Sequence, residues 1–286
     1  MTSFPFLAQR LFNVPLIIEA SKAEVIMAAL AERLGVTHLV RSDGGAGSLD
    51  AAQFITGDPE PERAFEITRE GIGIIPIRGT LVQRCGLHPY SGMTGLDGVR
   101  TKFAMALADD DVAGIILDID SPGGEVSGTF DLADAIYAAR GIKPIHAVLT
   151  ENAFSGAYAL ASACDRISVP RTGGCGSIGV IALLVDMSKA LTAAGITVNV
   201  IKFGAHKSDG SPVEPMSDDA REHFQAMVDE VGELFCVTVA RNRGLSAAQV
   251  RDTEAACFLA AESVALGLAD VVAPPDEAYQ ALAALI

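Results

Sequence analysis

The chain has 286 residues, half of them hydrophobic, with no tryptophan and a mean hydropathy of +0.34. This length and apolar content allow one large domain with a sizeable core and a further segment. The formal net charge of −15 argues against a nucleic-acid-binding protein, because affinity for a phosphate backbone comes from lysine and arginine.

The first 40 residues are predicted to form an N-terminal extension. Ser21 is a candidate N-cap, the apolar residues at 25, 26, 29, 30 and 34 have helical spacing, and Gly35 ends the pattern. Residues 41–63 are rich in glycine, aspartate and proline, which predicts a linker or mobile loop.

Residues 64–286 are predicted to form the main domain, in which apolar strands alternate with helices. Two short strands around a turn are expected within 65–81. Further strands are expected at 112–120, 144–149, 166–169, 179–186 and 197–201, and helices at 127–140, 155–163 and 188–194. Such alternation predicts βαβ units with right-handed crossovers and a parallel sheet covered on both faces.

After residue 216 the chain is expected to become helical. Ser217 is a candidate N-cap and Gly244 a stop for one long helix, and residues 246–249 fit a capping box. The apolar stripe of the long helix is interpreted as core, with an oligomer interface as the alternative. Its positions are 224, 227, 228, 231, 234, 235 and 239.

Three glycine-rich stretches fall at strand ends, where ligands bind in open α/β sheets. In the first, "DIDSPGGEV", the amides of Gly123 and Gly124 precede a helix and could hold a developing oxyanion; a plain strand-to-helix turn is the alternative. The stretch "GGCGSIGV" lacks the lysine of a P-loop and the spacing of a dinucleotide-binding loop, so we reject nucleotide binding.

The remaining stretch, "ENAFSGAYALASACD", places Ser155 at a strand-to-helix junction. The amide of Gly156 could donate to the same oxyanion as the glycines at 123 and 124. A small packing residue or an N-cap is the alternative interpretation. The G-x-S-x-G pattern is absent, since both 153 and 157 are alanine.

A serine nucleophile needs a base. None of the five histidines (His38, His88, His146, His206 and His223) has an obvious acidic partner at a suitable strand end. Lys207 lies in a loop after the last predicted strand, and a lysine can act as a base where burial lowers its pKa. For any single lysine, a solvated surface charge is the ordinary interpretation.

The cysteines and the apolar runs indicate the cellular compartment in which the protein is expected. An odd number of cysteines without metal-ligand spacing predicts free thiols in a reducing compartment. The apolar run at 178–185 is much shorter than the roughly 20 residues of a membrane-spanning helix. No small-residue cleavage site follows the N-terminal apolar patches, so we expect no signal peptide and a cytoplasmic protein.

Taken in order, "GIIPIRGTL", "DIDSPGGEV", "AFSGAYALASACDRISV", "GSIGV", "FGAHKSDGSPVEPMSDD" and "FLAAESVALGLAD" resemble the signal peptide peptidase A family of Ser–Lys serine proteases. The resemblance covers about residues 70–275. It implies an α/β, Clp protease/crotonase-like fold of repeated βαβ units. The expected fold also has an N-terminal helical extension and a helical C-terminal part.

The segment "LFNVPLIIEASKAEVIMAAL" is similar to the leader of the tailed-phage branch of that family, the minor capsid protein C-like head-maturation proteases. That branch implies action in the host cytoplasm or inside a procapsid. It also implies peptide or protein substrates of the phage scaffold, portal or capsid type. The family assembles into rings or domes, which implies a homo-oligomer.

By position, the resemblance implies that Ser155 is the nucleophile and Lys207 the general base. It implies oxyanion donors at Gly124 and Gly156, and Ser177 as the residue that orients the lysine, with no metal and no organic cofactor. The sequence departs from the family pattern at Phe154, Ala157 and His206, and in the loose segment "EAACFLAAES". These departures bear on substrate preference.

Three alternatives remain open from the sequence. A cellular signal-peptide-peptidase-like protease would use the same dyad on other substrates. A crotonase-type enzyme would use paired amides to stabilise a CoA enolate without a serine nucleophile. A non-catalytic capsid component would retain the fold alone.

Overall fold

The described strands form two sheets, and the strand-to-helix turn at Ser155 lies where the two sheets meet. The computed structural model describes residues 14–19, 22, 64–87 and 92–286. The predicted helix at 21–35 and the predicted linker at 41–63 lie outside these residues, apart from Lys22. The one part of the N-terminal extension placed in a strand is β1, Pro15–Ile18.

The larger sheet has the strand order β12-β10-β8-β6-β3-β2, with β9 against β8 and β13 against β9. Its pairs are parallel except at the two ends, β10–β12 and β2–β3. Its strands are β2 (Glu66–Ile67), β3 (Ile72–Arg78), β6 (Gly114–Ser121), β8 (Ile145–Phe154), β9 (Arg166–Val169), β10 (Gly174–Gly176), β12 (Cys257–Leu259) and β13 (Val271–Val272).

The smaller sheet has the order β11-β1-β7-β4-β5, so that strands from distant parts of the chain lie side by side. Besides β1, its strands are β4 (Thr80–Val82), β5 (Met93–Gly95), β7 (Gly123–Glu125) and β11 (Ile181–Ala182). The pairs of β1 with β7 and with β11 are antiparallel.

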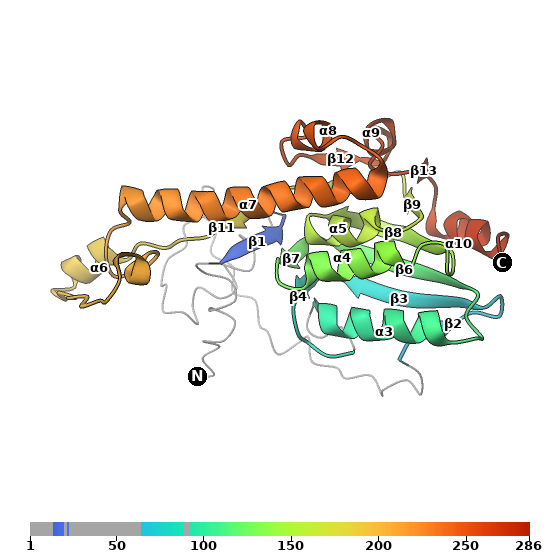
Figure 1. The fold of residues 1–286 in the computed structure, drawn as a ribbon, viewed down its shortest axis with the longest axis horizontal. Helices are drawn as coiled ribbons and strands as arrows, with labels where there is room; N and C mark the ends of the chain where they lie inside the picture. Colours follow the sequence, from blue (N-terminus) through green and yellow to red (C-terminus); the bar gives the residue numbers. More distant parts are fainter. Residues whose placement is uncertain (1–13, 20–21, 23–63, 88–91) are drawn as a thin grey trace.

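Helices cover both faces of the larger sheet (Figure 1). One face carries α3 (Leu96–Ala108), α4 (Thr129–Ala138) and α5 (Gly156–Ser162), and the other carries α10 (Pro275–Ala283). Along β6, Ile115, Leu117 and Ile119 belong to the first core, whereas Ile116 packs with α10. The continuous apolar run of this strand is therefore explained by burial on both faces, as predicted.

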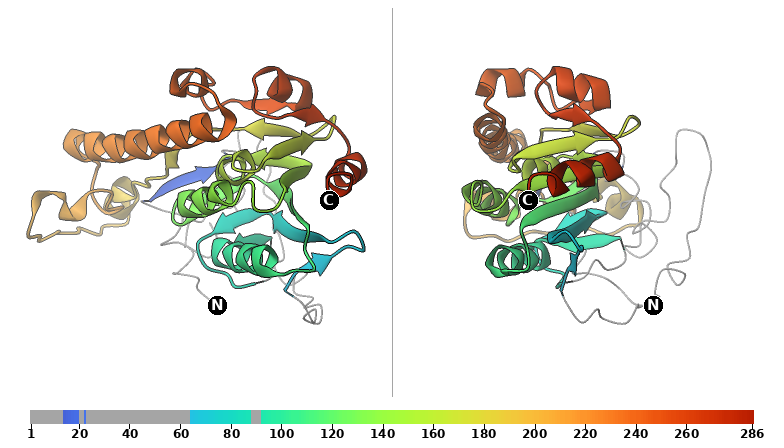
Figure 2. Two further views of the ribbon diagram at one scale, coloured as in Figure 1. Left: turned by 45° about the vertical axis from the view of Figure 1, so that its right-hand side comes forward. Right: turned by 90° about the vertical axis from the view of Figure 1, so that its right-hand side faces the viewer.

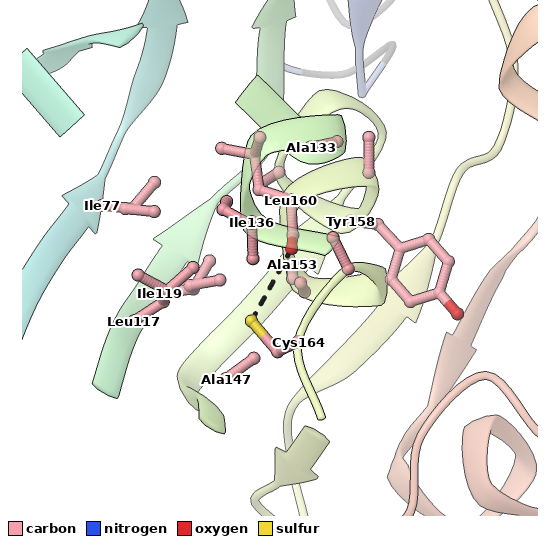
Figure 3. Close-up of a cluster of buried hydrophobic side chains, with 14 of the residues drawn as sticks. Ile77, Leu117, Ile119, Ala133, Ile136, Ala147, Ala153, Tyr158, Leu160 and Cys164 are labelled. Carbon is pink, nitrogen blue, oxygen red and sulfur yellow. Dashed lines mark hydrogen bonds between the residues drawn. The ribbon is translucent and has the colours of Figure 1, made fainter. Parts of the chain in front are cut away.

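Figure 3 shows the core beneath α5, where the helix backbone comes close to the sheet. Leu117 and Ile119 of β6 face Ile136 and Leu160 from the helices above, and all four are fully buried. The thiol of Cys164 donates to the carbonyl oxygen of Leu160 at 3.7 Å. All five cysteines are free thiols, which agrees with the part of the prediction that concerns disulfides.

The C-terminal part begins with α7 (Asp218–Arg243) and continues through α8 (Ala247–Arg251) and α9 (Ala260–Ala265). The predicted caps are confirmed, because Ser217 accepts from the Ala220 amide and Gly244 has a φ of 68°. The capping box at Ser246 is also present. Thus local sequence signals define both ends of the longest described helix.

The C-terminal half of α7 packs on the helices that cover the larger sheet. Phe235 stacks edge-on against Phe130 of α4 at 5.6 Å between ring centroids, and the Asn242 amide donates to the Ser162 hydroxyl at 2.9 Å. The N-terminal half projects beyond the sheets together with α6 (Ser188–Ala193), as Figure 1 and the left view of Figure 2 show. Leu234 and Val237 remain about half exposed. The stripe is therefore core along only part of its length.

One strand prediction was wrong, and another is confirmed only in part. Only Ile181 and Ala182 of the predicted strand 179–186 pair in a sheet, and residues 197–201 form no strand. A strand composition is not sufficient without a partner strand, and the segment 197–201 pairs with none of the described strands. Its apolar side chains stay exposed instead, with Ile201 98% and Phe203 101% accessible.

The described helices include none that is long and apolar enough to cross a membrane. The longest, α7, carries acidic residues in its first turn and arginines in its last.

An ion pair between Arg243 and Asp270 fastens the C-terminal part to the sheet. Arg243 donates to the Asp270 carboxylate at 2.7 and 3.1 Å, and the Ile167 amide donates to it at 2.6 Å. Burial acts to raise the pKa of the Asp270 carboxyl. The hydrogen bonds from Arg243 and Ile167 outweigh burial and leave that pKa below its ordinary value.

Asp270→Asn is expected to lower the free energy of unfolding at pH 7 by about 1–2 kcal/mol, because charge-assisted hydrogen bonds are lost. A carboxylate with a lowered folded-state pKa stabilises the fold above its unfolded pKa of about 3.9 and loses that effect as the pH falls through its folded pKa. Urea unfolding at pH 7 and pH 3 should therefore show a deficit that shrinks in acid.

Asp134→Asn is the matched control, because its pair with Arg241 is exposed and should contribute under about 0.5 kcal/mol. An Asp270→Asn deficit that is equal at both pH values would contradict the assignment.

Candidate active site

Ser155 occupies a sharp turn between β8 and α5. Its backbone has φ 54° and ψ −123°, a conformation that a non-glycine residue adopts only at a cost. The turn is held by the Ser155 amide, which donates to Gly176 at 2.8 Å, and by the Ser155 carbonyl, which accepts from Ala159 at 3.1 Å. Strain of this kind is typical of a nucleophile turn at the end of a strand.

The side chain of Ser155 is fully buried, and its hydroxyl has no hydrogen-bond partner among the described residues. A buried hydroxyl without a partner costs about 1–3 kcal/mol, so its retention needs a reason beyond packing. A nucleophile that is completed by another group provides such a reason.

The predicted oxyanion glycines come together with Ser155. A Cβ atom built on Gly123 would lie 2.8 Å from the Gly156 nitrogen and 2.9 Å from the Ser155 Cβ. A Cβ on Gly124 would lie 1.9 Å from the Leu81 carbonyl oxygen. Gly123 also has a φ of 94°, so both positions require glycine.

Strand β1 lies directly against these glycines. Ile17 is opposite Gly124 in the ladder, and a Cβ on Gly156 would lie 2.9 Å from the Ile17 Cδ1 atom. Sequence reasoning noted this stretch as an apolar patch within a segment similar to a phage leader, and it did not predict that Ile17 lies at the site. The run "PLII", two β-branched residues in an extended segment, was the signal that could have indicated a strand.

Ser177 follows β10, the strand beside β8. It also has a positive φ, 52°, and its amide donates to Ala256 at 2.8 Å. Its hydroxyl hydrogen-bonds the Cys257 thiol: burial raises the pKa of this thiol and the Ser177 bond opposes that effect. The residue before it, Gly176, accepts from the Ser155 amide, so Ser177 borders the Ser155 turn.

Lys207 lies apart from these groups. It is exposed in the 3₁₀-helix η3 (Ala205–Ser208), within the projecting segment that carries α6 (Figure 1). Asp209 connects this segment to α7 by accepting from His206 at 2.8 Å and from His223 at 3.0 Å. Among the described residues, no hydrogen bond joins Lys207 to Ser155 or Ser177. The structure thus brings four of the five predicted site residues to one place and leaves the predicted base outside.

The described histidines do not replace the lysine. His146 is the second residue of β8 and lies nine positions before Ser155, roughly 30 Å away along an extended strand. Burial, followed by the nearby Arg166 charge, lowers the pKa of His146 and favours its neutral form. His206 and His223 belong to the projecting region, and the other two histidines, His38 and His88, lie outside the described residues.

Two further features could bind ligands. His206, Asp209 and His223 bring their ligand atoms within 4.8 Å of one another, as a metal ion would require, although hydrogen bonds to Asp209 account for this arrangement. A cavity of about 780 Å³ lies between residues 180–186 and the N-terminal half of α7. Leu184 and Phe224 are among its apolar lining residues.

Comparison with known proteins supplies the context for this site. The chain is 38% identical to the head-tail preconnector protein GP5 of Enterobacteria phage P21 over 279 residues, which are 95% of this chain and 56% of that protein. It is 38% identical to the capsid assembly protease C of Escherichia phage lambda over 278 residues, 94% of this chain and 63% of that protein. The chain therefore spans less than two thirds of the length of either phage relative.

A bacterial relative is more distant. The putative signal peptide peptidase SppA of Enterococcus faecium is 27% identical over 184 residues, 64% of this chain and 54% of that protein. Residues 138–286, just over half of the chain, match the family described as peptidase family S49, and this range contains both Ser155 and Lys207. This match, together with the strained serine turn, shows that the chain belongs to peptidase family S49.

Proposed function

We propose that the protein is a serine endopeptidase that uses a Ser155–Lys207 dyad and an acyl-enzyme intermediate. The observation that carries the proposal is the strained turn of Ser155, whose buried hydroxyl has no partner among the described residues and whose Cβ lies, with the Gly156 nitrogen, against Gly123, the residue before Gly124. A crotonase-type enzyme would need the paired amides but has no use for a serine in this position. A finer fold assignment, the Clp protease/crotonase-like fold, is part of the same proposal.

In the reaction, neutral Lys207 takes the hydroxyl proton while the Ser155 oxygen attacks the carbonyl carbon of the scissile bond. The amides of Gly124 and Gly156 donate to the oxyanion, each contributing on the order of 3 kcal/mol. The tetrahedral intermediate then collapses, and Lys207 gives its proton to the leaving amine. Water hydrolyses the ester and restores the serine.

We further propose that the base comes from a neighbouring copy of the chain. Lys207 is exposed on a segment that projects from the body, whereas Ser155 has no partner among the described residues. The same segment exposes Ile201 and Phe203, which are apolar and whose burial favours an intermolecular contact. Burial of the lysine amine against a second copy would favour its neutral, proton-accepting form.

The substrates are proposed from the phage relatives. One of these is named a capsid assembly protease and the other a head-tail preconnector, which supports a head-maturation protease that cuts scaffold, portal or capsid proteins. Such a protein would act in the host cytoplasm or within the procapsid. Neither the dyad chemistry nor the proposed substrates require a metal or an organic cofactor.

The test is incubation of the purified chain with the co-encoded head proteins, and separately with casein as an unfolded substrate, followed by mass spectrometry of the products. Defined cleavage products are expected from the wild type and none from Ser155→Ala. Ser168→Ala, a buried serine of β9, is the matched control and should cleave normally. Identical products from wild type and Ser155→Ala would overturn the assignment of the nucleophile.

A further inference from the structure

Strand β1 is placed as a peptide substrate would be placed in the candidate active site. It runs antiparallel to β7, with Leu16 opposite Glu125, Ile17 opposite Gly124 and Ile18 opposite Gly123. The Glu19 amide donates to the Pro122 carbonyl at 2.8 Å. Because hydrogen-bonded pairs alternate along an antiparallel ladder, Ile17 and Gly124 form the next such pair. The amide of Gly124, a proposed oxyanion donor, is therefore directed at the Ile17 carbonyl.

The second proposed donor lies beside the same carbonyl. The point where Gly123 would carry a Cβ is 2.3 Å from the Ile17 oxygen, 2.8 Å from the Gly156 nitrogen and 2.9 Å from the Ser155 Cβ. These three groups therefore surround one small space. The Ile17 oxygen lies in the position that the carbonyl of a scissile bond takes in a serine peptidase.

The side chains of β1 also fit the groove. Leu16, Ile17 and Ile18 are at most 5% exposed, and Ile17 belongs to the main core. The terminal carbon of Ile17 lies 2.9 Å from the Cβ that Gly156 lacks, so the side chain packs onto the glycine that follows the nucleophile. In this position the groove accepts an aliphatic side chain.

We propose that β1 is the first substrate of the enzyme and that Ser155 cleaves the bond between Ile17 and Ile18. The inference rests on the proposed peptidase function. The Ser155 oxygen forms an ester with the Ile17 carbonyl carbon, the C–N bond to Ile18 breaks, and the Ile18 amine takes the proton accepted by the base. Water then hydrolyses the ester, which releases residues 1–17 and leaves a chain that begins at Ile18.

The same geometry explains how the uncut chain stays inactive. While β1 pairs with β7, another peptide cannot pair with the same edge of Gly123 and Gly124. Lys207 is remote from Ser155 in this state. The bond between Ile17 and Ile18 is therefore held beside Ser155 while the general base is absent. Arrival of the base would cut β1 and open the groove to other substrates.

The test follows the freshly purified full-length protein by intact-mass spectrometry and N-terminal sequencing, with casein cleavage measured in parallel. Wild type should divide into residues 1–17 and 18–286, and Ser155→Ala should remain whole. Ile17→Val, which keeps a β-branched aliphatic side chain, should be cut at a rate within about threefold of wild type. Ile17→Asp, which places a charge against Gly156, should be cut at least tenfold more slowly.

Wild type that cleaves casein while its Ile17–Ile18 bond stays intact would overturn the self-cleavage and leave the proposed function standing. Equal cutting of Ile17→Asp and Ile17→Val would also overturn it, because the groove would then not select the side chain. Failure to cleave both casein and the chain itself would instead reject the proposed peptidase function, on which the inference depends.

Discussion

Mixing the Ser155→Ala and Lys207→Ala variants is expected to restore peptidase activity that neither variant has alone. Each single variant should lose at least about 10⁴-fold in kcat, as is usual when one member of a nucleophile–base unit is removed. If the base reaches Ser155 from a neighbouring copy, mixed oligomers contain interfaces that join an intact serine to an intact lysine. Random mixing should restore about a quarter of wild-type activity.

The measurement is casein cleavage after the two variants have been dissociated and reassembled together. Lys207→Arg is a control for charge, since it keeps a cation that cannot act as a base, and it should be as inactive as Lys207→Ala. Lys202→Ala changes an exposed lysine of the same segment and should stay active. Full activity of Lys207→Ala would reject the base, and inactive mixtures would place Lys207 in the same chain as its serine.

Gly123→Ala is expected to reduce kcat by about 10²- to 10³-fold, as much as the loss of one oxyanion donor, because its methyl group would block the space in front of the donors at Gly124 and Gly156. Its methyl group would lie 2.3 Å from the Ile17 carbonyl oxygen and 2.8 Å from the Gly156 nitrogen. Contacts this short would fill the space that a substrate carbonyl needs. The same change also imposes a φ of 94° on an alanine, which costs about 1–2 kcal/mol.

Gly141→Ala separates the two effects. Gly141 has a φ of 81°, similar to that of Gly123, but no atom lies within 4 Å of the Cβ it would carry. It should lose about the same stability in urea unfolding while it retains wild-type kcat. Comparable activity of the two alanine variants would mean that the space beside Gly123 does not hold the reacting carbonyl.

Local chemistry explains most of what could be predicted from the sequence. The ends of α7 follow from Ser217 and Gly244, because caps satisfy backbone groups within a few residues. The continuous apolar run of β6 indicated a strand covered on both faces. Ser155 and Gly156 could be predicted as neighbours at a strand end, since they are adjacent in the chain.

The predictions that the structure did not confirm have a common cause. The segment 197–201 has the composition of a strand, but a strand forms only where it pairs with another strand, and this segment pairs with none of the described strands. The stripe of α7 has one pattern along its length, yet Phe235 is fully buried whereas Leu234 of the same stripe is 49% exposed. Periodicity indicates which residues share a face but not what covers it.

For this protein, the sequence by itself determined the element types, the caps and the residue types needed for a serine peptidase. Only the tertiary structure decided that Ile17 fills the space at Gly123 and Gly156 and that Lys207 lies outside it. The physical reason is the separation along the sequence over which each kind of interaction acts. Capping and periodicity act over a few residues, whereas the pairing of β1 with β7 joins positions more than 100 residues apart through backbone hydrogen bonds, which carry no side-chain signature.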